Sequence, residues 1–458
     1  MLLVLLGAFA LAYGNALGGD FQYDDYSVIV DNPAVHSLAA WSRSADSIRP
    51  LLKASFALNW ATSPAPWGFH LANLALHGAN AVLVWALCRR FLLACKECGQ
   101  ASIPGFLPLF AALLFALHPV QTEAVTYISG RSVAFMATFY LAGVLAWVEG
   151  RASQSRALVL MVSPGLFLLA FLVRETAITL PIALLLWAKL HGREHPEDRP
   201  VWRDLLPHGL LLMGLAVLLA WHRGYVRLLM SGFQGRSLRE NLLSQLDAVV
   251  YLLSKLVWPT NLNIDPRLPV RTEWSTALAW KALLIAAILG LALMAWRRRP
   301  GLAFGILWFF LHLLPTNSVI PRLDVVNERQ LYLASAGLFL GLGRECAPFL
   351  RQPGLLRSLG MAAVATLAIA MGWLTRQRNA DYRTEITLWE SSARAGPHNP
   401  RAFNNLGCAY LFAGNQAKAR EALTIALRLD PNYAWAKANL ALCDPDPKVT
   451  TVDSAERQ

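Results

Sequence analysis

Long runs of apolar residues alternate with shorter polar segments from the N-terminus to about residue 375. Each run has about 18–22 residues, enough for an α-helix to cross ~30 Å of hydrocarbon. The pattern therefore predicts an all-α, polytopic membrane protein with about 11 transmembrane helices. The predicted spans are residues 2–17, 69–92, 104–118, 132–149, 157–173, 176–190, 205–222, 276–296, 301–317, 330–345 and 356–375.

The polar segments between these spans alternate in charge. Five of them are rich in Lys and Arg, and short basic loops face the cytoplasm; they are 88–96, 150–156, 191–203, 296–299 and 344–357. The other segments then share the extracytoplasmic face, including a first loop at 18–68. Residues 242–258 contain Asp247 and Lys255 at amphipathic spacing, which favours an interfacial helix over a twelfth span.

Composition agrees with a membrane protein surrounded by lipids. The chain has 458 residues, of which 55% are hydrophobic and 15% charged, against roughly 25% charged residues in soluble domains. The net charge of +12 comes from basic residues in short loops, so no nucleic-acid partner is expected. Cys95 and Cys98 form a C-x-x-C in a basic loop without a second pair, so a zinc or redox site there is not favoured.

After residue 375 the sequence takes on the pattern of a tetratricopeptide helix pair. Residues Ala402–Gly407 recur one repeat length later as Ala436–Ala441. We predict a repeat segment over 381–445, able to bind a protein partner, and a disordered tail at 446–458; an ordinary amphipathic hairpin is the alternative. The positions that match the repeat are Phe403, Leu406, Gly407, Tyr410, Ala419, Leu423, Ala426 and Pro431.

The first loop contains two adjacent carboxylates, Asp24 and Asp25, between Tyr23 and Tyr26. Burial beside a like charge raises the pKa of a carboxylate, which suits a general base. The alternative is a solvated loop with helix-capping aspartates. Farther along this loop, residues Arg49–Trp60 are expected to form a short interfacial helix, and Arg49 is a candidate for binding a phosphate.

The second loop follows a helix that Pro119 prevents from continuing. His118 and Glu123 lie there, and together with Asp24 they would suit a divalent cation or could orient an acceptor hydroxyl. Either residue could instead be purely structural. Arg131 ends this loop.

Two further segments carry charges on the same predicted face. Arg174 and Glu175 lie between two spans and form either a turn salt bridge or part of a site. Arg322, Glu328 and Arg329 lie before a later span. Guanidinium groups at a membrane face suit a lipid-linked phosphate, whereas snorkelling to the interface is the alternative for Arg329.

Taken in order, these segments resemble one family, the transmembrane tetratricopeptide-containing protein O-mannosyltransferases and their bacterial relatives. The resemblance covers essentially the whole chain. It rests on Tyr23-Asp24-Asp25, His118-Pro-x-x-Thr-Glu123-Ala, Ser129-Gly-Arg131-Ser, Arg174-Glu175, Asn327-Glu328-Arg329-x-Leu-Tyr332 and the repeat segment. Two departures are Val133, where the family usually has an acid, and Arg174, where it usually has lysine.

The resemblance implies a GT-C fold over residues 1–375 and transfer of a mannose-like sugar from a polyprenyl or dolichyl phosphate to a protein or glycan hydroxyl. Asp24 or Asp25 would be the base, Glu123 the second acidic residue and Arg329 a contact of the lipid phosphate. Val133 weakens the case for a divalent cation. The short chain favours a bacterial inner membrane, with the repeats in the periplasm.

Two other classes of function remain open from the sequence. A carrier or flippase of lipid-linked glycans would need charges along a pathway inside the spans. A membrane scaffold would use its repeats to recruit partners and would not depend on Asp24 or Asp25.

Overall fold

The computed structural model describes residues 1–44, 48–93, 105–191, 200–351 and 354–443. Within these ranges the chain is helical and contains no β-strand. The expected all-α fold is therefore confirmed for this part of the protein. The C-x-x-C at Cys95 and Cys98 and the predicted disordered tail at 446–458 lie outside the described residues.

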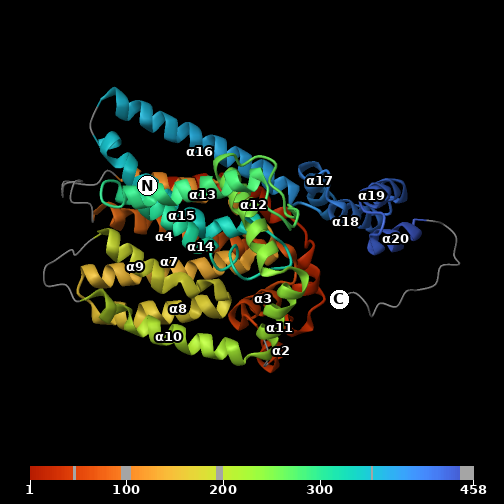
Figure 1. Cartoon of the computed structure of the whole chain (residues 1–458), viewed down its shortest axis with the longest axis horizontal. Coiled ribbons are helices and arrows are strands. Elements are labelled where there is room, and N and C mark those ends of the chain that lie inside the picture. Colours follow the sequence, from red (N-terminus) through yellow and green to blue (C-terminus); the bar gives the residue numbers. More distant parts are fainter. Residues whose placement is uncertain (45–47, 94–104, 192–199, 352–353, 444–458) are drawn as a thin grey trace.

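The apolar helices run side by side in one bundle (Figure 1). They are α1 (Leu2–Tyr13), α4 (Pro66–Leu93), α5 (Phe106–Leu117), α7 (Arg131–Ala152), α8 (Ser163–Val173), α9 (Leu180–His191), α10 (Val201–Trp221), α13 (Thr276–Ala295), α14 (Pro300–Leu313), α15 (Leu331–Arg351) and α16 (Leu355–Asp381).

Five of the described helices, or stretches of helix, are long and apolar enough to cross a membrane by length and composition. They are Pro66–Leu93, Ile128–Ala152, Val201–Trp221, Thr276–Ala295 and Leu355–Asp381. A sixth is counted if Phe106–Leu117 and Pro119–Val125, bent by 52°, form one broken span. The bend lies where Pro119 was expected to interrupt the helix. The predicted number of about 11 spans is not confirmed.

Glycines allow α14 and α15 to pack closely against each other. A Cβ added to Gly337 would lie 2.1 Å from Cγ of Trp308, and one added to Gly341 would lie 2.3 Å from the carbonyl oxygen of Gly301. The two helices can therefore approach only because these positions lack side chains, as is common where apolar helices pack in membranes. The indole nitrogen of Trp308 donates a hydrogen bond to the Leu333 carbonyl at 2.8 Å.

Several shorter elements, among them α2, α3 and α11, lie at the end of the bundle from which the C-terminal helices project (Figure 1). The helices outside the bundle are α2 (Leu38–Arg43), α3 (Pro50–Thr62), α6 (Thr122–Val125), α11 (Arg223–Gly235) and α12 (Leu238–Val257). The single-turn elements are η1 (Gly14–Gly18), η2 (Tyr26–Val30), η3 (Pro33–Val35), η5 (Pro119–Gln121), η6 (Ile128–Gly130), η7 (Leu158–Val162), η8 (Glu175–Thr179) and η9 (Glu328–Gln330).

The uncertain segment 242–258 falls almost entirely in α12, which is not among the described helices apolar enough to span a membrane. Ser237 and Glu240 form a capping box at its start, satisfying free N–H groups of the first turn. Asp247 is buried and pairs with Arg271, with their atoms 2.6 Å apart, and with Lys281. These features agree with the expected interfacial helix, although the membrane placement of α12 remains a prediction.

The C-terminal segment consists of α17 (Glu385–Ala395), α18 (Pro400–Phe412), α19 (Gln416–Leu429) and α20 (Ala434–Ala441), and each packs on the next. A Cβ on Gly407 would lie 2.5 Å from Cγ of Leu423, so the glycine permits α18 and α19 to approach. These helices occupy the predicted repeat segment, and their assignment to the tetratricopeptide family remains a prediction.

Candidate active site

Asp25 joins the first loop to the second. Its buried carboxylate accepts hydrogen bonds from the backbone N–H of Gln22 at 3.0 Å and from the backbone N–H of Ser129 at 2.8 Å. The Ser129 hydroxyl donates to the same carboxylate. Burial raises the pKa of Asp25 to about 7, and these hydrogen bonds oppose the shift. Both carboxylate oxygens are thus occupied by loop contacts.

Asp24 has different surroundings, although it is the next residue. It is only partly buried, and its backbone N–H donates to the Tyr127 hydroxyl at 3.0 Å. Burial raises the pKa of its carboxyl group, while the charge of Arg329 and a side-chain hydrogen bond with Tyr127 lower it. The carboxylate therefore lies near a cation but is less enclosed than that of Asp25.

Glu123 and Arg329 come from the second loop and from η9. Oε1 of Glu123 lies 3.5 Å from Nε of Arg329, and its Oε2 accepts the backbone N–H of Arg329 at 2.8 Å. Gly130 allows the second loop to fold this closely, because a Cβ there would lie 2.1 Å from the Glu123 carbonyl oxygen. Arg329 interacts electrostatically with both Glu123 and Asp24, so the structure brings these three predicted residues together.

Arg49 and Glu175 form a bidentate ion pair. Nε and Nη2 of Arg49 lie 2.9 and 2.6 Å from the two carboxylate oxygens of Glu175. Arg49 has a φ of 63° directly before Pro50, which begins α3. Burial would raise the pKa of Glu175, but the guanidinium of Arg49 lowers it to about 2. The pair joins the first loop to the turn after α8.

Two further arginines lack an acidic partner within 4 Å among the described residues. Arg174 donates to the Ser132 hydroxyl at 2.8 Å, and its pKa is held well below the usual range by burial and by the charges of Arg49 and Arg322. The pKa of Arg322 falls to about 10 because of burial and the charges of Arg329 and Arg49. Burial is the larger cause of both shifts, and the like charges of the neighbouring guanidinium groups add to it.

We name Arg49, Arg174, Arg322 and Arg329 the arginine cluster. Glu175 and Glu123 are its direct ion-pair partners among the described residues, so two of its four positive charges remain uncompensated at short range. Enclosed cationic sites of this kind favour an anionic ligand, especially one carrying phosphate oxygens.

Two other predicted site residues are directed elsewhere. The ring nitrogens of His118 contact the Leu256 carbonyl at 2.9 Å and the Val120 N–H at 3.3 Å. Glu328 accepts hydrogen bonds from the Tyr251 hydroxyl at 2.6 Å and the Asn263 N–H at 2.9 Å. The contact of His118 with Leu256 and both contacts of Glu328 link distant segments of the chain, whereas the Val120 contact is local; this supports structural roles for His118 and Glu328.

Arg131 also has mainly structural contacts. Its three guanidinium nitrogens donate to the Asn73 side chain at 2.6 Å and to the carbonyls of Phe69 and Ser55 at 2.9 and 3.3 Å. The guanidinium also lies over the Phe56 ring, 4.8 Å from its centroid. Arg131 therefore links α3 and α4 to the start of α7, and no nitrogen is left without a partner for a donor phosphate.

The candidate divalent cation receives no support from the geometry. Within the described residues, no group of three or more His, Cys, Asp or Glu side chains is placed to hold a metal ion. Glu123 is instead turned to Arg329, and His118 to the α12 carbonyl of Leu256. The predicted ligand set Asp24, Glu123 and His118 is thus not assembled in this structure.

Sequence reasoning did not single out the contacts between the first loop and the C-terminal helices. Gln22 donates to the Tyr382 carbonyl at 2.6 Å, and the Tyr23 N–H donates to Glu385 at 2.8 Å. The Tyr23 ring meets Trp389 edge to face, with centroids 5.1 Å apart. The one hint in the sequence was Tyr23, an aromatic residue next to the two aspartates.

Arg401 on α18 is a second residue that the sequence did not indicate. Its Nε lies 2.6 Å from Asp265, in the segment after α12, and its Nη2 lies 2.8 Å from Asp324. Arg401 also lowers the pKa of Asp24, which burial raises. Its pairing with distant acids follows from the docking of α18 and not from any local motif.

Comparison with known proteins gives consistent relatives. A protein O-mannosyl-transferase of Caenorhabditis elegans, F38B6.6, is 25% identical over 94% of this chain and 63% of its own length. Human protein O-mannosyl-transferase TMTC1 is 26% identical over 97% of the chain and 56% of its own length. Mouse protein O-mannosyl-transferase TMTC3 is 23% identical over 95% of the chain and 52% of its own length.

The chain thus spans little more than half the length of several curated relatives that it matches. No family model and no solved structure matches it. The resemblance expected from the sequence motifs is confirmed: over most of its length the chain is homologous to curated proteins that are named TMTC protein O-mannosyl-transferases.

Proposed function

We propose that the protein is a membrane glycosyltransferase that moves mannose from a polyprenyl or dolichyl phosphate to a hydroxyl of a protein acceptor on the extracytoplasmic face. The observation that carries the proposal is the electrostatic interaction of Asp24 with Arg329, a member of the arginine cluster. A partly buried carboxylate next to concentrated positive charge suits a reaction that removes a proton from one substrate and expels a phosphate from the other. The names of the relatives support the sugar and the acceptor.

Asp24 is the proposed base. It takes the proton of the acceptor hydroxyl, whose oxygen forms a bond to the anomeric carbon of the sugar. The bond from that carbon to the phosphate oxygen breaks, and its electron pair leaves with the polyprenyl phosphate. A single displacement of this kind inverts the configuration at the anomeric carbon.

Asp25 is the proposed positioning residue for this base. Its oxygens accept hydrogen bonds from Gln22 and Ser129, so it fixes the first loop on the second and is not free to meet a substrate. Tyr127 holds the backbone of Asp24 from the same second loop. Two neighbouring carboxylates can therefore divide catalysis and positioning between them.

The arginine cluster is the proposed site of the donor phosphate. Arg174 and Arg322 support this assignment best, since neither has an acidic partner among the described residues within 4 Å, and burial and like charges lower the pKa values of both. A bound donor phosphate would reduce the repulsion between the guanidinium groups. The leaving phosphate carries more negative charge than the bound donor, so the arginines would stabilise it more strongly. Glu175 fixes Arg49, and Glu123 fixes the backbone and guanidinium of Arg329.

The test uses purified full-length chain with polyprenyl-phosphate mannose and a hydroxyl acceptor peptide, and measures release of polyprenyl phosphate and mannosylation of the peptide. Replacement Asp24→Asn should lower turnover by about 10²–10⁴-fold, the usual contribution of a general base. Asp31→Asn, an exposed acid in the same loop, is the matched control and should keep wild-type turnover.

Undiminished transfer by the Asp24→Asn variant would overturn its assignment as the base. Failure of the wild-type chain to use any polyprenyl-phosphate sugar would overturn the transferase proposal and leave the scaffold hypothesis in its place. The anomeric configuration of the mannosylated peptide checks the single displacement independently.

A further inference from the structure

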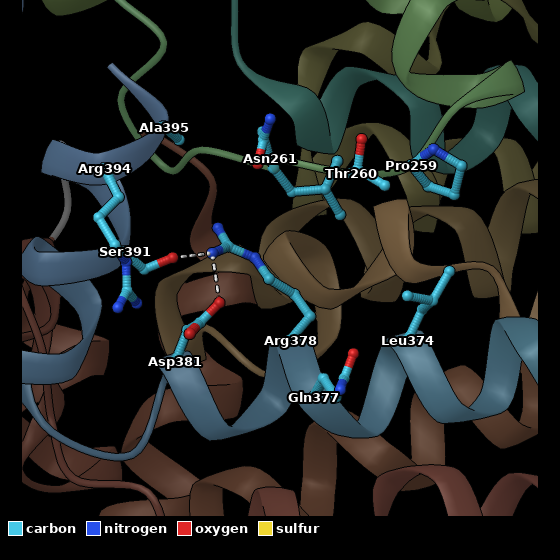
Figure 2. A pocket seen from close by; sticks show the side chains of 11 residues that line it. Pro259, Thr260, Asn261, Leu374, Gln377, Arg378, Asp381, Ser391, Arg394 and Ala395 are labelled. Atoms are coloured by element: carbon cyan, nitrogen blue, oxygen red, sulfur yellow. Dashed lines mark hydrogen bonds and ion pairs between the residues drawn. The ribbon is translucent and has the colours of Figure 1, made fainter. Parts of the chain in front are cut away.

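A cavity of about 360 Å³ opens at the junction of the bundle and the C-terminal helices. Three segments line it: the end of α16, the last turn of α17 and residues 259–262 after α12. Figure 2 shows Leu374, Gln377 and Arg378 rising from α16 into this space, with Ser391 facing them. The proposed transfer reaction makes no use of this cavity.

Arg378 is the central polar group of the cavity. Its side chain is buried, and Nη1 donates to Asp381 and to the Ser391 hydroxyl, each at 2.9 Å (Figure 2). Its Nε is buried without a hydrogen-bond partner among the described residues. Buried N–H groups are rarely left unsatisfied in proteins, and an anion in the cavity would give this one an acceptor.

The remaining lining adds positive charge and hydrogen-bond donors. The side chain of Arg394 is exposed and makes no ion pair or hydrogen bond within the described part of the chain. Asp381 is the single acidic residue in the lining, and it is already paired with Arg378. The Ser391 hydroxyl accepts from Arg378 and can donate its own proton. Together these groups suit an oxygen-rich anion.

The surroundings of the cavity indicate a membrane-water boundary. Leu374 belongs to α16, a candidate span in whose most apolar window no residue is buried by the rest of the described protein. Next to the lining residues, Trp373 and Trp258 are 61% and 71% exposed. Exposed tryptophans gather at the level of lipid headgroups, so the cavity lies where a headgroup can reach it.

We propose that this cavity binds the phosphate of an anionic membrane phospholipid, with Arg378 and Arg394 as its cationic contacts. The site is separate from the arginine cluster and does not depend on the transferase proposal. A lipid bound there touches the bundle and α17 at once, and so holds the C-terminal helices against the membrane domain.

The experiment measures lipid binding to the purified full-length chain in detergent by native mass spectrometry, with phosphatidylglycerol and phosphatidylcholine as probes. The wild-type chain should bind phosphatidylglycerol more tightly. Arg394→Ala should weaken that binding about fivefold, the factor expected for one basic residue at a membrane surface. Because Arg394 is exposed and unpaired among the described residues, the variant should fold normally. Arg428→Ala, which removes an exposed arginine from α19, is the matched control and should behave as wild type.

Gln377→Glu is the second variant, because it places a negative charge in the lining without removing any contact of Arg378. It should weaken binding of phosphatidylglycerol at least as much as Arg394→Ala, with phosphatidylcholine unaffected. Equal binding of the two lipids, or unchanged binding of phosphatidylglycerol in both variants, would overturn the proposal.

Inorganic phosphate and glycerol 3-phosphate distinguish a lipid headgroup from a soluble phosphate. At concentrations up to the millimolar range they should not displace phosphatidylglycerol, because they lack the acyl chains that add to its binding. Displacement by either compound in the wild-type chain, absent in Arg394→Ala, would assign the cavity to a soluble phosphate and refute the lipid source.

Discussion

At the scale of residues, Asp24 and Asp25 differ in what their carboxylates do. Asp25 accepts three hydrogen bonds from Gln22 and Ser129. Asp24 is more exposed to solvent, and its carboxylate interacts electrostatically with Arg329. The alternative of a solvated loop does not describe Asp25, which is buried. The carboxylate of Asp25 thus holds two loops together, and that of Asp24 is the one we propose as the base.

The pH dependence of transfer follows from the surroundings of Asp24. Burial raises its pKa above the ordinary value of 3.8, and a general base acts only when it is deprotonated. We expect kcat/KM to rise with pH through this raised pKa and to fall below it. The acidic limb should disappear in the residual activity of Asp24→Asn and persist in Asp31→Asn; an unchanged limb in Asp24→Asn would assign it to another group.

Arg322 permits a test of the arginine cluster. Replacement Arg322→Gln removes a charge-assisted contact of about 1.5–3 kcal/mol, so the KM for the lipid donor should rise about tenfold to a hundredfold. The KM for the acceptor peptide should stay near the wild-type value. Arg239→Gln removes an exposed arginine from α12 and should change neither constant. An unchanged donor KM in Arg322→Gln would exclude Arg322 from the phosphate site.

At the scale of elements, the second loop depends on Gly130. Its missing side chain lets η6 lie against the backbone of Glu123, at a distance that no Cβ permits. The carboxylate of Glu123 in turn holds the start of η9 and Arg329. A local turn therefore sets the position of a cation that is more than 200 residues away in the chain.

Gly130→Ala should consequently lower both stability and transfer. Overpacking of this kind costs about 1–3 kcal/mol, and the displaced loop would carry Glu123 away from Arg329. Gly165→Ala is the matched control, because a Cβ on Gly165 in α8 meets nothing within 4 Å. Thermal unfolding in detergent and the transfer rate measure the two effects. A Gly130→Ala chain as stable and active as Gly165→Ala would contradict this account.

At the scale of the whole molecule, the C-terminal helices are docked on the same loops that form the candidate site. Arg401 pairs with Asp265 and Asp324, while Tyr23 contacts Glu385 and Trp389. A helical array this short needs support from outside itself, and these contacts with the rest of the chain provide it. An acceptor held by the C-terminal helices would thus lie near Asp24.

Loss of this docking should be detected in the first loop. Arg401→Gln leaves Asp265 and Asp324 without their cation, and we expect the backbone amides of residues 20–25 to exchange hydrogen for deuterium faster, with lower transfer. The control Arg428→Gln on α19 should leave both unchanged. Slow exchange in the first loop of Arg401→Gln would show that the loop holds its position without α18.

The sequence by itself determined the helical fold, the apolar runs and the family resemblance, because each depends on local periodicity or on motifs in a fixed order. It also identified Asp24, Glu123, Arg174, Arg322 and Arg329 as charges worth attention on one predicted face. It could not determine how many runs span the membrane, since apolar helices such as α8 and α14 are shorter in the structure than a full span.

Only the tertiary structure separated the roles of these charges. Arg131, His118 and Glu328 belong to the same motifs as Glu123 and Arg329, yet their contacts lie with other carbonyls, hydroxyls and amides. Arg401 and Tyr127 contact residues that are distant in sequence, Asp324 and Asp24, and only the fold brings these pairs together. The physical reason is that the direction of a side chain, its burial and its neighbouring charges arise from packing between remote segments, and no local pattern encodes them.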